Sequence, residues 1–599
     1  MARVETSEDT LSRLVRGFED WLTVTQESRD EAELARDYYD GKQWTEEEQA
    51  TFRLRKQPII TDNMLKDKVE YCIGLELATR TDPKAYPRNP ADEEAAEAAT
   101  DALRYIWDKS DAQQVKSDIA ENMFVEGFGG AEVYFRSGEV TIKRNRWERC
   151  YFDPHSSEKN YADATYLGTF VWMDLEDAEA KWPDAEFWDI VSAHASGQDS
   201  DSDRPRENFI DRSRKRVRIL ETYCRHKGQW YRALWTYAGV IEYAVSSWLD
   251  EDGEPEHPYC WMSAYVDRNN NRYGVVRRYK SLQDEINHRR SKALHLLNTN
   301  RIVMEEGAVE DVEQIRREAA KPDGVLVRRQ GFEFDILTNN EMAAGQTALL
   351  QDARNALAVT GPKAMSNSSP SQSGRAKEID RQSDVLELGR LFDQLRHWQK
   401  AVNRKSWNRV KQFWTEEKWI RVTDDESRVK FVALNQPITA QEAVEEAIKS
   451  GQMPHPQLEF MAPDAIVGKR NDVSKLDVDI VIDEAPDVVT LQQEQFTNLV
   501  DLARAGVTFP PEIYVEASGL RNKQALLEKL KGGEDPAMLE QQEKQQELQE
   551  RGANAQVAES EAKAAKTQAE AEQTRIENMA GMAGLHGLAT NGPPPNPMM

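Results

Sequence analysis

The chain has 599 residues, of which 39% are hydrophobic and 31% charged, so it is long enough for several soluble domains. Its 78 Lys and Arg residues are outnumbered by 105 Asp and Glu residues, which gives a formal net charge of −27. This charge excludes a protein that grips nucleic acid over its whole surface, because tight phosphate binding needs basic side chains, and any DNA contact must be weak or local.

The first 130 residues are predicted to be mainly helical. Gly41 is a typical helix stop, an amphipathic helix follows Asn63, and further helices are predicted within 89–110 and 115–130. The first helix of the chain is predicted from apolar residues that recur at the spacing of one helix face. These residues are Leu11, Leu14, Val15, Phe18, Trp21 and Leu22.

Two β-hairpins are predicted in the next part of the chain. Apolar and polar residues alternate on both sides of Ser137-Gly138, and the same pattern flanks Lys227-Gly228. Together with the preceding helices, these strands predict a mixed α+β domain up to Asp267.

Long helices are predicted after Asp267. One lies at 277–298 and a second at 341–361. Between them, two strand-like runs, "RIVMEEGAV" at 301–309 and "GVLVRR" at 324–329, flank an acidic helix.

The stretch "GPKAMSNSSPSQSGRAKEID", residues 361–380, is predicted to be a loop. It is rich in Ser, Asn and Gly, and it contains no acidic side chain before Glu378. A very long helix is predicted within 375–419, where Leu388, Leu391 and Phe392 begin an apolar stripe.

The C-terminal part alternates short β-like stretches with helices. Strands are predicted within 419–435 and 476–485, and helices at about 490–530. The tail, 531–599, has residues of high helix propensity but no apolar seam, so it is either an exposed helix or disordered, and it will not form a coiled coil unaided. The whole chain is therefore predicted to be α+β and predominantly helical.

Motifs for phosphate, metal or covalent chemistry are missing from the sequence. There is no G-x-x-x-x-G-K-[ST] motif, and the glycines of "GFGGAEV" end a helix and enter a strand, the reverse of a dinucleotide fingerprint. The nine histidines include no H-x-x-x-H pair. We therefore expect no cofactor, no metal site and no enzyme activity.

Cellular location and packing are predicted from composition. No apolar run reaches the length of a membrane span, and "MARVETSEDT" lacks the apolar core of a signal peptide, so we expect the protein in the cytoplasm of the cell that makes it. Fifteen tryptophans suggest aromatic anchors in a core or at subunit interfaces. The cysteines form no C-x-x-C pair and are predicted to be reduced, partly buried thiols: Cys72, Cys150, Cys224 and Cys260.

The second half of the chain has an unusual order of parts: helix, short β-containing excursion, helix, polar loop, very long helix. Five stretches across residues 30–480 add to this order: "DYYDGKQW" (37–44), "QPIITDN" (57–63), "QDEINHRRSKALHLLNTNRIVMEEGAV" (283–309), "KPDGVLV" (321–327) and "SGRAKEIDRQ" (373–382). In this order and in these stretches, the chain resembles the portal proteins of tailed bacteriophages, in particular the P22-like podovirus type.

The resemblance implies a ring, dodecameric in this family, at one vertex of the virion capsid, with double-stranded DNA passing through its centre. It implies partners in the terminase large subunit, capsid and scaffolding proteins and tail adaptor proteins, and no membrane. It also implies these parts: a wing (1–272), stem helix 1 (273–300), a clip (301–336), stem helix 2 (337–360), a tunnel loop (361–374), a long wing helix (375–418), a β-containing return to the wing (419–484), a helical crown (485–530) and a short polar tail (531–599).

The resemblance places the polar loop against the moving DNA. A conduit for DNA must not bind it well, and a loop with few cations and many neutral hydrogen-bonding groups suits brief contact with the backbone. A solvent-exposed connector between helices is the alternative interpretation. The residues expected near DNA are Lys363, Ser366, Asn367, Ser368, Ser369, Ser371, Gln372, Ser373, Arg375 and Lys377.

The resemblance also places the clip where the packaging motor and later the tail adaptors dock. Charged side chains suit the reversible exchange of partners, although an ordinary solvated helix face has the same composition. The residues expected to dock partners are Glu305, Glu306, Glu310, Asp311, Glu313, Arg316 and Arg317.

Two other classes of function compete with a portal. A structural assembly protein of the virion that never conducts DNA would also use Trp-rich interfaces and no active site. A nuclease or ATPase of DNA packaging is disfavoured, because the phosphate-binding loop is missing.

Overall fold

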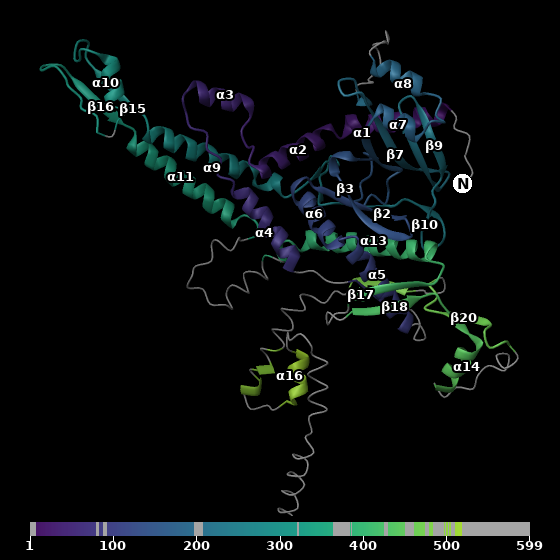
Figure 1. The fold of residues 1–599 in the computed structure, drawn as a ribbon. Helices are drawn as coiled ribbons and strands as arrows, with labels where there is room; N and C mark the ends of the chain where they lie inside the picture. Colours follow the sequence, from purple (N-terminus) through teal and green to yellow (C-terminus); the bar gives the residue numbers. More distant parts are fainter. Residues whose placement is uncertain are drawn as a thin grey trace, which may run out of the picture. The chain divides into compact units, whose positions relative to one another are not determined.

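The computed structural model divides into two compact units, one within residues 1–485 and one within 486–599, and most of the described elements belong to the first (Figure 1). The predicted tail at 531–599 lies outside the described residues. The structure describes residues 8–78, 83–87, 93–196, 208–319, 321, 323–362, 384, 386–423, 429–449, 461–473, 478–482, 496, 499–500, 502–504 and 509–517.

Four helices open the chain; the first, the one that ends at Gly41 and the one after Asn63 were predicted, whereas the short helix between the last two was not. Gly41 ends the second of them in the left-handed conformation, with φ at 91°, and a capping box of Thr45 and Glu48 starts the third. The helices are α1 (Glu8–Val24), α2 (Gln26–Asp40), α3 (Glu46–Leu54) and α4 (Met64–Ala78).

A three-stranded antiparallel sheet follows, in the order β12-β2-β3. The predicted turn at Ser137-Gly138 is confirmed, because both residues have the positive φ that a tight hairpin needs. Helix α6 packs on this sheet. The elements of this region are β1 (Pro83–Pro87), α5 (Glu93–Lys109), α6 (Ala112–Val125), β2 (Phe128–Arg136), β3 (Glu139–Asn145) and β12 (Tyr259–Ser263).

A second, six-stranded sheet has the order β4-β5-β7-β8-β9, with β6 paired to β7. Its central hairpin turns at Lys227-Gly228, again at positive φ, so the second predicted hairpin is also confirmed. The elements of this part of the chain are η2 (Trp147–Arg149), β4 (Cys150–Phe152), β5 (Tyr166–Asp174), α7 (Leu175–Lys181), α8 (Trp188–Ala195), β6 (Ile210–Asp211), β7 (Arg216–His226), β8 (Gln229–Thr236) and β9 (Gly239–Val245). Two separate two-stranded sheets follow, one of β10 (Trp248–Leu249) and β11 (Pro255–Glu256), the other of β13 (Tyr265–Val266) and β14 (Arg272–Tyr273).

Two long helices then form an antiparallel pair, and the segment between them lies at their far end (Figure 1). We call residues 300–338 the distal segment. The elements are α9 (Val276–Leu297), β15 (Asn300–Met304), α10 (Val312–Ala319), β16 (Phe334–Thr338) and α11 (Asn340–Val359).

One predicted strand of the distal segment is wrong. The run at 324–329 forms no strand, and β15 pairs instead with β16, in a register that sets Ile302 opposite Ile336. Both isoleucines are half-buried, whereas Val325 and Val327 are each 73% exposed. The valines of the predicted run pack into no core formed by the described residues, so burial selects the later segment as the strand.

The remaining elements up to residue 485 also belong to the first unit, and one short helix belongs to the second. Helix α13 packs on the three-stranded sheet, and β21 pairs with β1. The strands predicted within 419–435 and 476–485 are confirmed. The elements are α13 (Gly389–Phe413), β17 (Lys418–Thr423), β18 (Val429–Leu434), β19 (Gln436–Thr439), α14 (Ala440–Lys449), β20 (Ile466–Arg470), β21 (Val478–Ile482) and, in the second unit, α16 (Pro511–Ala517).

The largest core joins α4, α5, α6, α9, α11 and α13 with the three-stranded sheet. The prediction of tryptophan anchors is confirmed for the core, because Trp107, Trp398 and Trp407 are at most 3% exposed within it. All four cysteines are free and buried, as predicted. The mixed α+β architecture, with more helix than strand, is confirmed for the described residues.

Candidate functional site

The pair of long helices carries charge unevenly. Helix α9 has six Lys and Arg residues, and α11 has one. Four of the six α9 cations are already ion-paired: Arg277 with Glu31 and Asp267, Arg278 with Glu387, Arg289 with Glu285, and Arg290 with Asp62. A paired guanidinium is less available to a phosphate, so the basic composition of α9 does not make a strong DNA-binding stripe.

Three polar residues on the buried face of α9 anchor the helix to an N-terminal segment. Gln283, Asn287 and Ser291 are spaced four residues apart and are at most 1% exposed. Gln283 donates to the backbone carbonyl of Asp62 at 2.7 Å, Asn287 accepts the N–H of Asp62 at 2.9 Å, and Ser291 accepts the N–H of Ile60 at 3.1 Å. Because buried polar groups need partners, these bonds fix one position of α9 along the segment.

The same network extends to the loop after α2. Asn287 donates to Gln43 at 2.6 Å, Gln43 donates to Asn63 at 2.8 Å, and Asn63 donates to the carbonyl of Tyr39 at 2.9 Å. Three of the stretches that carry the resemblance, 37–44, 57–63 and the start of 283–309, therefore meet at one place. We call this place the root of the helix pair.

Asp62 joins both long helices at the root. Its carboxylate pairs with Arg290 of α9 at 2.8 Å and with Arg354 of α11. We expect Asp62→Asn to lower the free energy of unfolding by about 1–2 kcal/mol, because it removes two half-buried, charge-assisted contacts but keeps the backbone bonds. Urea denaturation measures this, with Glu285→Gln as the control for an ordinary pair along one helix. Equal effects of the two variants would contradict this role of Asp62.

The predicted docking residues are all exposed, but most of them make local contacts. Glu305 accepts the N–H of Glu333, and Glu310 pairs with Arg329 at 3.1 Å. Asp311 caps the start of α10 by accepting two backbone N–H groups, and Glu313 pairs with Arg316. Within the described part of the chain, Glu306 and Arg317 are the two of these seven residues whose side chains contact neither a backbone group nor a charged side chain, so they are the most available to another protein.

Exposed apolar side chains in the distal segment were missed by the sequence interpretation. Val303 is 56% exposed and Leu337 46%, and both lie on one face of the β15–β16 ribbon, where Asp335 is opposite Val303 and Arg301 is opposite Leu337. Val325, Val327 and Phe332 are also exposed. A two-stranded ribbon with an uncovered apolar face is marginal in water, so another surface is expected to cover it. The alternation of side chains between the two faces of a strand, in "RIVM" (301–304) and "DIL" (335–337), is the sequence signal from which this exposed apolar face could have been predicted.

The residues predicted to contact DNA, from Lys363 to Lys377, lie outside the described residues. The structure describes only the approach to this segment, where Gly361 and Pro362 are buried, and the return from it at Asp384, which is 4% exposed.

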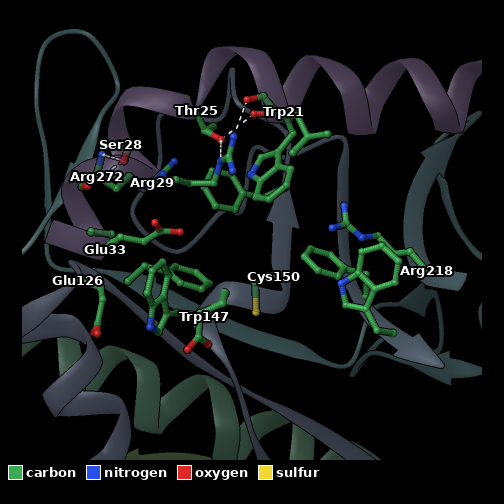
Figure 2. A pocket seen from close by; sticks show the side chains of 17 residues that line it. Trp21, Thr25, Ser28, Arg29, Glu33, Glu126, Trp147, Cys150, Arg218 and Arg272 are labelled. Carbon is green, nitrogen blue, oxygen red and sulfur yellow. Dashed lines mark hydrogen bonds between the residues drawn. The ribbon is translucent and has the colours of Figure 1, made fainter. Parts of the chain in front are cut away.

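A cavity of about 290 Å³ lies between α1, α2 and the two sheets, and Figure 2 shows its lining. Aromatic side chains line much of it, and Arg218 stacks on Phe170 and Trp172 at 4.4 and 4.6 Å from the ring centres. Cys150 also lines the cavity, but burial raises the pKa of its thiol well above the usual value, so no reactive thiolate is available there. Cys150 is therefore not poised as a catalytic nucleophile.

Glu126, beside this cavity, is a buried acid in an ion pair. Its carboxylate accepts a hydrogen bond from the Arg36 guanidinium at 2.5 Å, and Arg36 also donates to the carboxylate of Glu121 at 2.6 Å. Burial raises the pKa of Glu126 to about 7, although Arg36 opposes the shift. The two facing carboxylates outweigh burial and raise the pKa of Arg36, so it is Glu126 that takes up a proton as the pH falls.

This pKa predicts a pH-dependent stability. A carboxyl whose folded pKa lies above its unfolded value of 4.5 binds a proton more tightly in the folded state, so stability falls as pH rises from about 4.5 to 7. The contribution is on the order of 3 kcal/mol. We expect Glu126→Gln to abolish this part of the decline in urea denaturation between pH 5 and 8. Glu121→Gln, which touches the same arginine from a one-third exposed position, should retain it.

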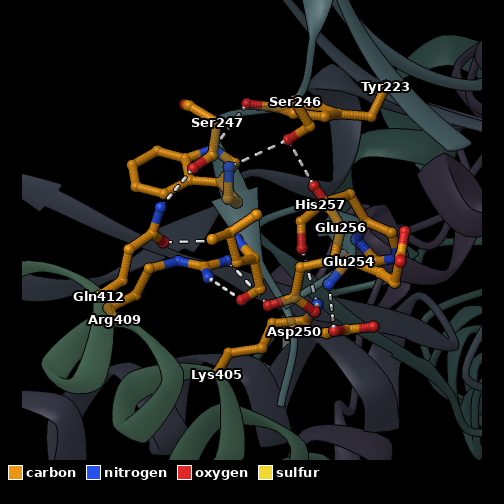
Figure 3. A network of polar contacts seen from close by, with 12 residues as sticks. Tyr223, Ser246, Ser247, Asp250, Glu254, Glu256, His257, Lys405, Arg409 and Gln412 are labelled. Atoms are coloured by element: carbon orange, nitrogen blue, oxygen red, sulfur yellow. Dashed lines mark hydrogen bonds and ion pairs between the residues drawn. The ribbon is translucent and has the colours of Figure 1, made fainter. Parts of the chain in front are cut away.

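A second buried ionic network ties α13 to the excursion between β9 and β12 (Figure 3). Arg409, whose side chain is fully buried, lies 3.0 Å from Glu256, and Lys405 lies 2.5 Å from the same carboxylate. Arg409 also donates to the carbonyl of Leu249 at 2.8 Å, and Gln412 donates to that of Ser247 at 2.6 Å. These contacts fix the position of α13 against residues 247–256 of the same unit.

Other chemistry was sought over the part of the chain that the structure describes. There, no group of three or more His, Cys, Asp or Glu side chains is arranged to hold a metal ion. Among the described helices, none is both long enough and apolar enough to cross a membrane.

Comparison with known proteins gives two results. A family model described as phage P22-like portal protein matches residues 15–574. A curated portal protein of Helicobacter pylori bacteriophage KHP30 is 20% identical over 420 residues, or 67% of this chain. The chain spans 66% of the length of that relative, just under two thirds. The family match includes the root, both long helices and the distal segment.

Proposed function

Because the chain belongs to the phage P22-like portal protein family, we propose that it forms a ring at one vertex of a phage capsid, through which double-stranded DNA is packaged and ejected. In this proposal α9 and α11 are the stem helices, the distal segment is the clip, and residues 361–374 are the tunnel loop. The ring is a dodecamer of identical subunits and has no catalytic activity of its own.

The observation that carries the ring is the uncovered apolar surface of the distal segment. Val303, Leu337 and Phe332 are exposed at the end of an arm of two helices, where the single chain supplies little to cover them. In a ring, the neighbouring subunit supplies that cover. Large exposed apolar side chains at one end of an extended element are typical of surfaces that become buried on assembly.

Electrostatics support passage of DNA without tight binding. The net charge of −27 repels DNA on average, and the cations of α9 are mostly committed to carboxylates of the same chain. Each phosphate that a protein neutralises adds affinity, which would slow a moving duplex. An acidic ring whose α9 cations are mostly paired is therefore a low-friction channel.

Docking of partners is assigned to the distal segment. We propose that the terminase large subunit and later the tail adaptors contact its exposed charges, with Glu306 and Arg317 as the first residues to test, because neither has a local partner among the described residues. Capsid and scaffolding proteins would contact other surfaces of the ring.

Electron microscopy of the purified protein tests the proposal. We expect closed rings whose central hole admits a DNA duplex of about 20 Å diameter. Rings of the variant that lacks residues 366–372 should assemble normally, but particles built with them should package or retain less DNA. Filaments, monomers or plugged rings would favour the alternative, a structural assembly protein of the virion that conducts no DNA.

A further inference from the structure

The two ends of the polar segment 363–383 converge on one turn of α4. Lys68 and Tyr71 are three residues apart and so lie on the same side of this helix. Lys68 contacts Pro362, just before the segment, and Tyr71 contacts Asp384, just after it. Both contacts involve described residues and are independent of the segment itself.

Lys68 binds the chain where α11 ends. Its ammonium donates to the carbonyls of Ala358 at 3.0 Å, Thr360 at 3.4 Å and Pro362 at 2.6 Å, and the residue is only 4% exposed. The last carbonyls of a helix have no partners within it, and a cation there also interacts favourably with the helix dipole. All three N–H groups of the lysine are used at this one place.

The chain turns sharply at the same point. Gly361 has φ at 74°, and a Cβ atom on it would lie 2.1 Å from the hydroxyl of Tyr279 on α9. Only glycine fits this conformation and this close approach. The path out of α11 is therefore set by α4 on one side and by α9 on the other.

Tyr71 binds the chain where it returns. Its hydroxyl donates to Asp384 at 2.8 Å, and Asp384 accepts the backbone N–H of Leu388 at its carbonyl, shortly before α13 begins. Burial lowers the pKa of Lys68, and the negative charge of Asp384 opposes this shift, so the returning carboxylate lies within electrostatic reach of the ammonium. The exit and the return are thus side by side.

We propose that Lys68 and Tyr71 form a loop-base clamp, a pair of positioning residues that fix both ends of segment 363–383 to α4 and thereby set where the tunnel loop stands relative to the DNA. This role in DNA handling rests on the proposed function of the loop. A chain segment whose ends are held together has fewer accessible conformations than one whose ends move independently. The clamp therefore fixes the two points, Pro362 and Asp384, between which the segment runs.

Hydrogen exchange of assembled rings, read by mass spectrometry, tests the clamp. Lys68→Met removes the donors and keeps the side-chain length, and Tyr71→Phe removes a single hydroxyl. We expect the first to raise exchange of amides at 357–361, and the second at 384 and 386–388, each by about tenfold, as expected for a lost buried hydrogen bond. Lys66→Met, an exposed lysine on the same helix, and Tyr105→Phe, a hydroxyl elsewhere, should change neither region.

The outcomes separate the clamp from general stability and from the function of the loop. A uniform rise across the first unit, or no rise at either end, would overturn the clamp. DNA retention by particles built with the variant rings gives the second readout. If the variant lacking 366–372 loses DNA but Lys68→Met and Tyr71→Phe retain it, the clamp does not position the loop for DNA. If all of these variants retain DNA, the proposed function of the loop fails, and the end-specific exchange still decides whether the clamp exists.

Discussion

Replacing Glu256 by Gln is expected to lower the free energy of unfolding of the first unit by about 3–5 kcal/mol. Glu256 is the only carboxylate shown in contact with both Lys405 and Arg409 among the described residues (Figure 3). Arg409 has no exposed side-chain surface and Lys405 has 13%. Glutamine keeps the shape but leaves two buried cations without a counter-charge, and their desolvation is then uncompensated.

Urea denaturation, followed by tryptophan fluorescence, measures this effect. Asp174→Asn is the matched control, because its pair with Arg216 is about half exposed and is expected to contribute at most about 1 kcal/mol. A triple variant, Glu256→Leu with Lys405→Met and Arg409→Met, should recover most of the loss, since it removes the cations together with their partner. If the triple variant is as unstable as Glu256→Gln, packing rather than unpaired charge explains the effect.

Introducing a carboxylate into the uncovered face of the distal segment is expected to prevent ring assembly. Val303→Asp or Leu337→Asp replaces an exposed apolar side chain that the proposed ring buries against a neighbour. Burying an unpaired charge costs about 2–4 kcal/mol at each interface, and a ring repeats this cost between every pair of subunits. The folded subunit should remain intact, because both side chains are about half exposed within it.

Analytical ultracentrifugation and electron microscopy distinguish the two states. The variants should sediment as folded subunits at concentrations where the unmodified protein forms rings, with unchanged circular dichroism. Gln330→Asp adds the same charge at an exposed polar residue of the same segment and should still form rings. Normal rings from both Val303→Asp and Leu337→Asp would show that this face is not a subunit interface.

Local signals predicted the elements well where one physical cause dominates. The hairpins at Ser137-Gly138 and Lys227-Gly228 follow from the need for positive φ, and the stop at Gly41 follows from the left-handed cap. The amphipathic helices followed from apolar periodicity. The run at 324–329 failed because β-propensity is a preference for a half-buried surface, and the chain offers that surface to 334–338 instead.

The candidate site was predicted less completely. Most of the charges expected to dock partners turned out to hold the distal segment together, as Asp311 does by capping α10. The stretch "QPIITDN" contributed to the resemblance, but no physical role for its residues followed from the sequence. Its Asp62 and Asn63 belong to the root, where they bind residues more than 200 positions later or 20 positions earlier.

The sequence by itself determined the α+β composition, the long helices, the lack of motifs for phosphate or metal chemistry, and the charge that excludes tight DNA binding. These properties depend on periodicity and turn residues, which act between neighbours in the chain, or on net charge, which is a sum over the chain, so the sequence is enough to predict them. Only the tertiary structure decided that Glu256 neutralises two cations of α13, that residues 37–44 and 57–63 hold the root, and that Lys68 and Tyr71 hold both ends of one segment. Each of these depends on partners far apart in the chain, and the low-dielectric interior makes such pairings decisive because an unpaired charge or hydrogen-bonding group there is costly.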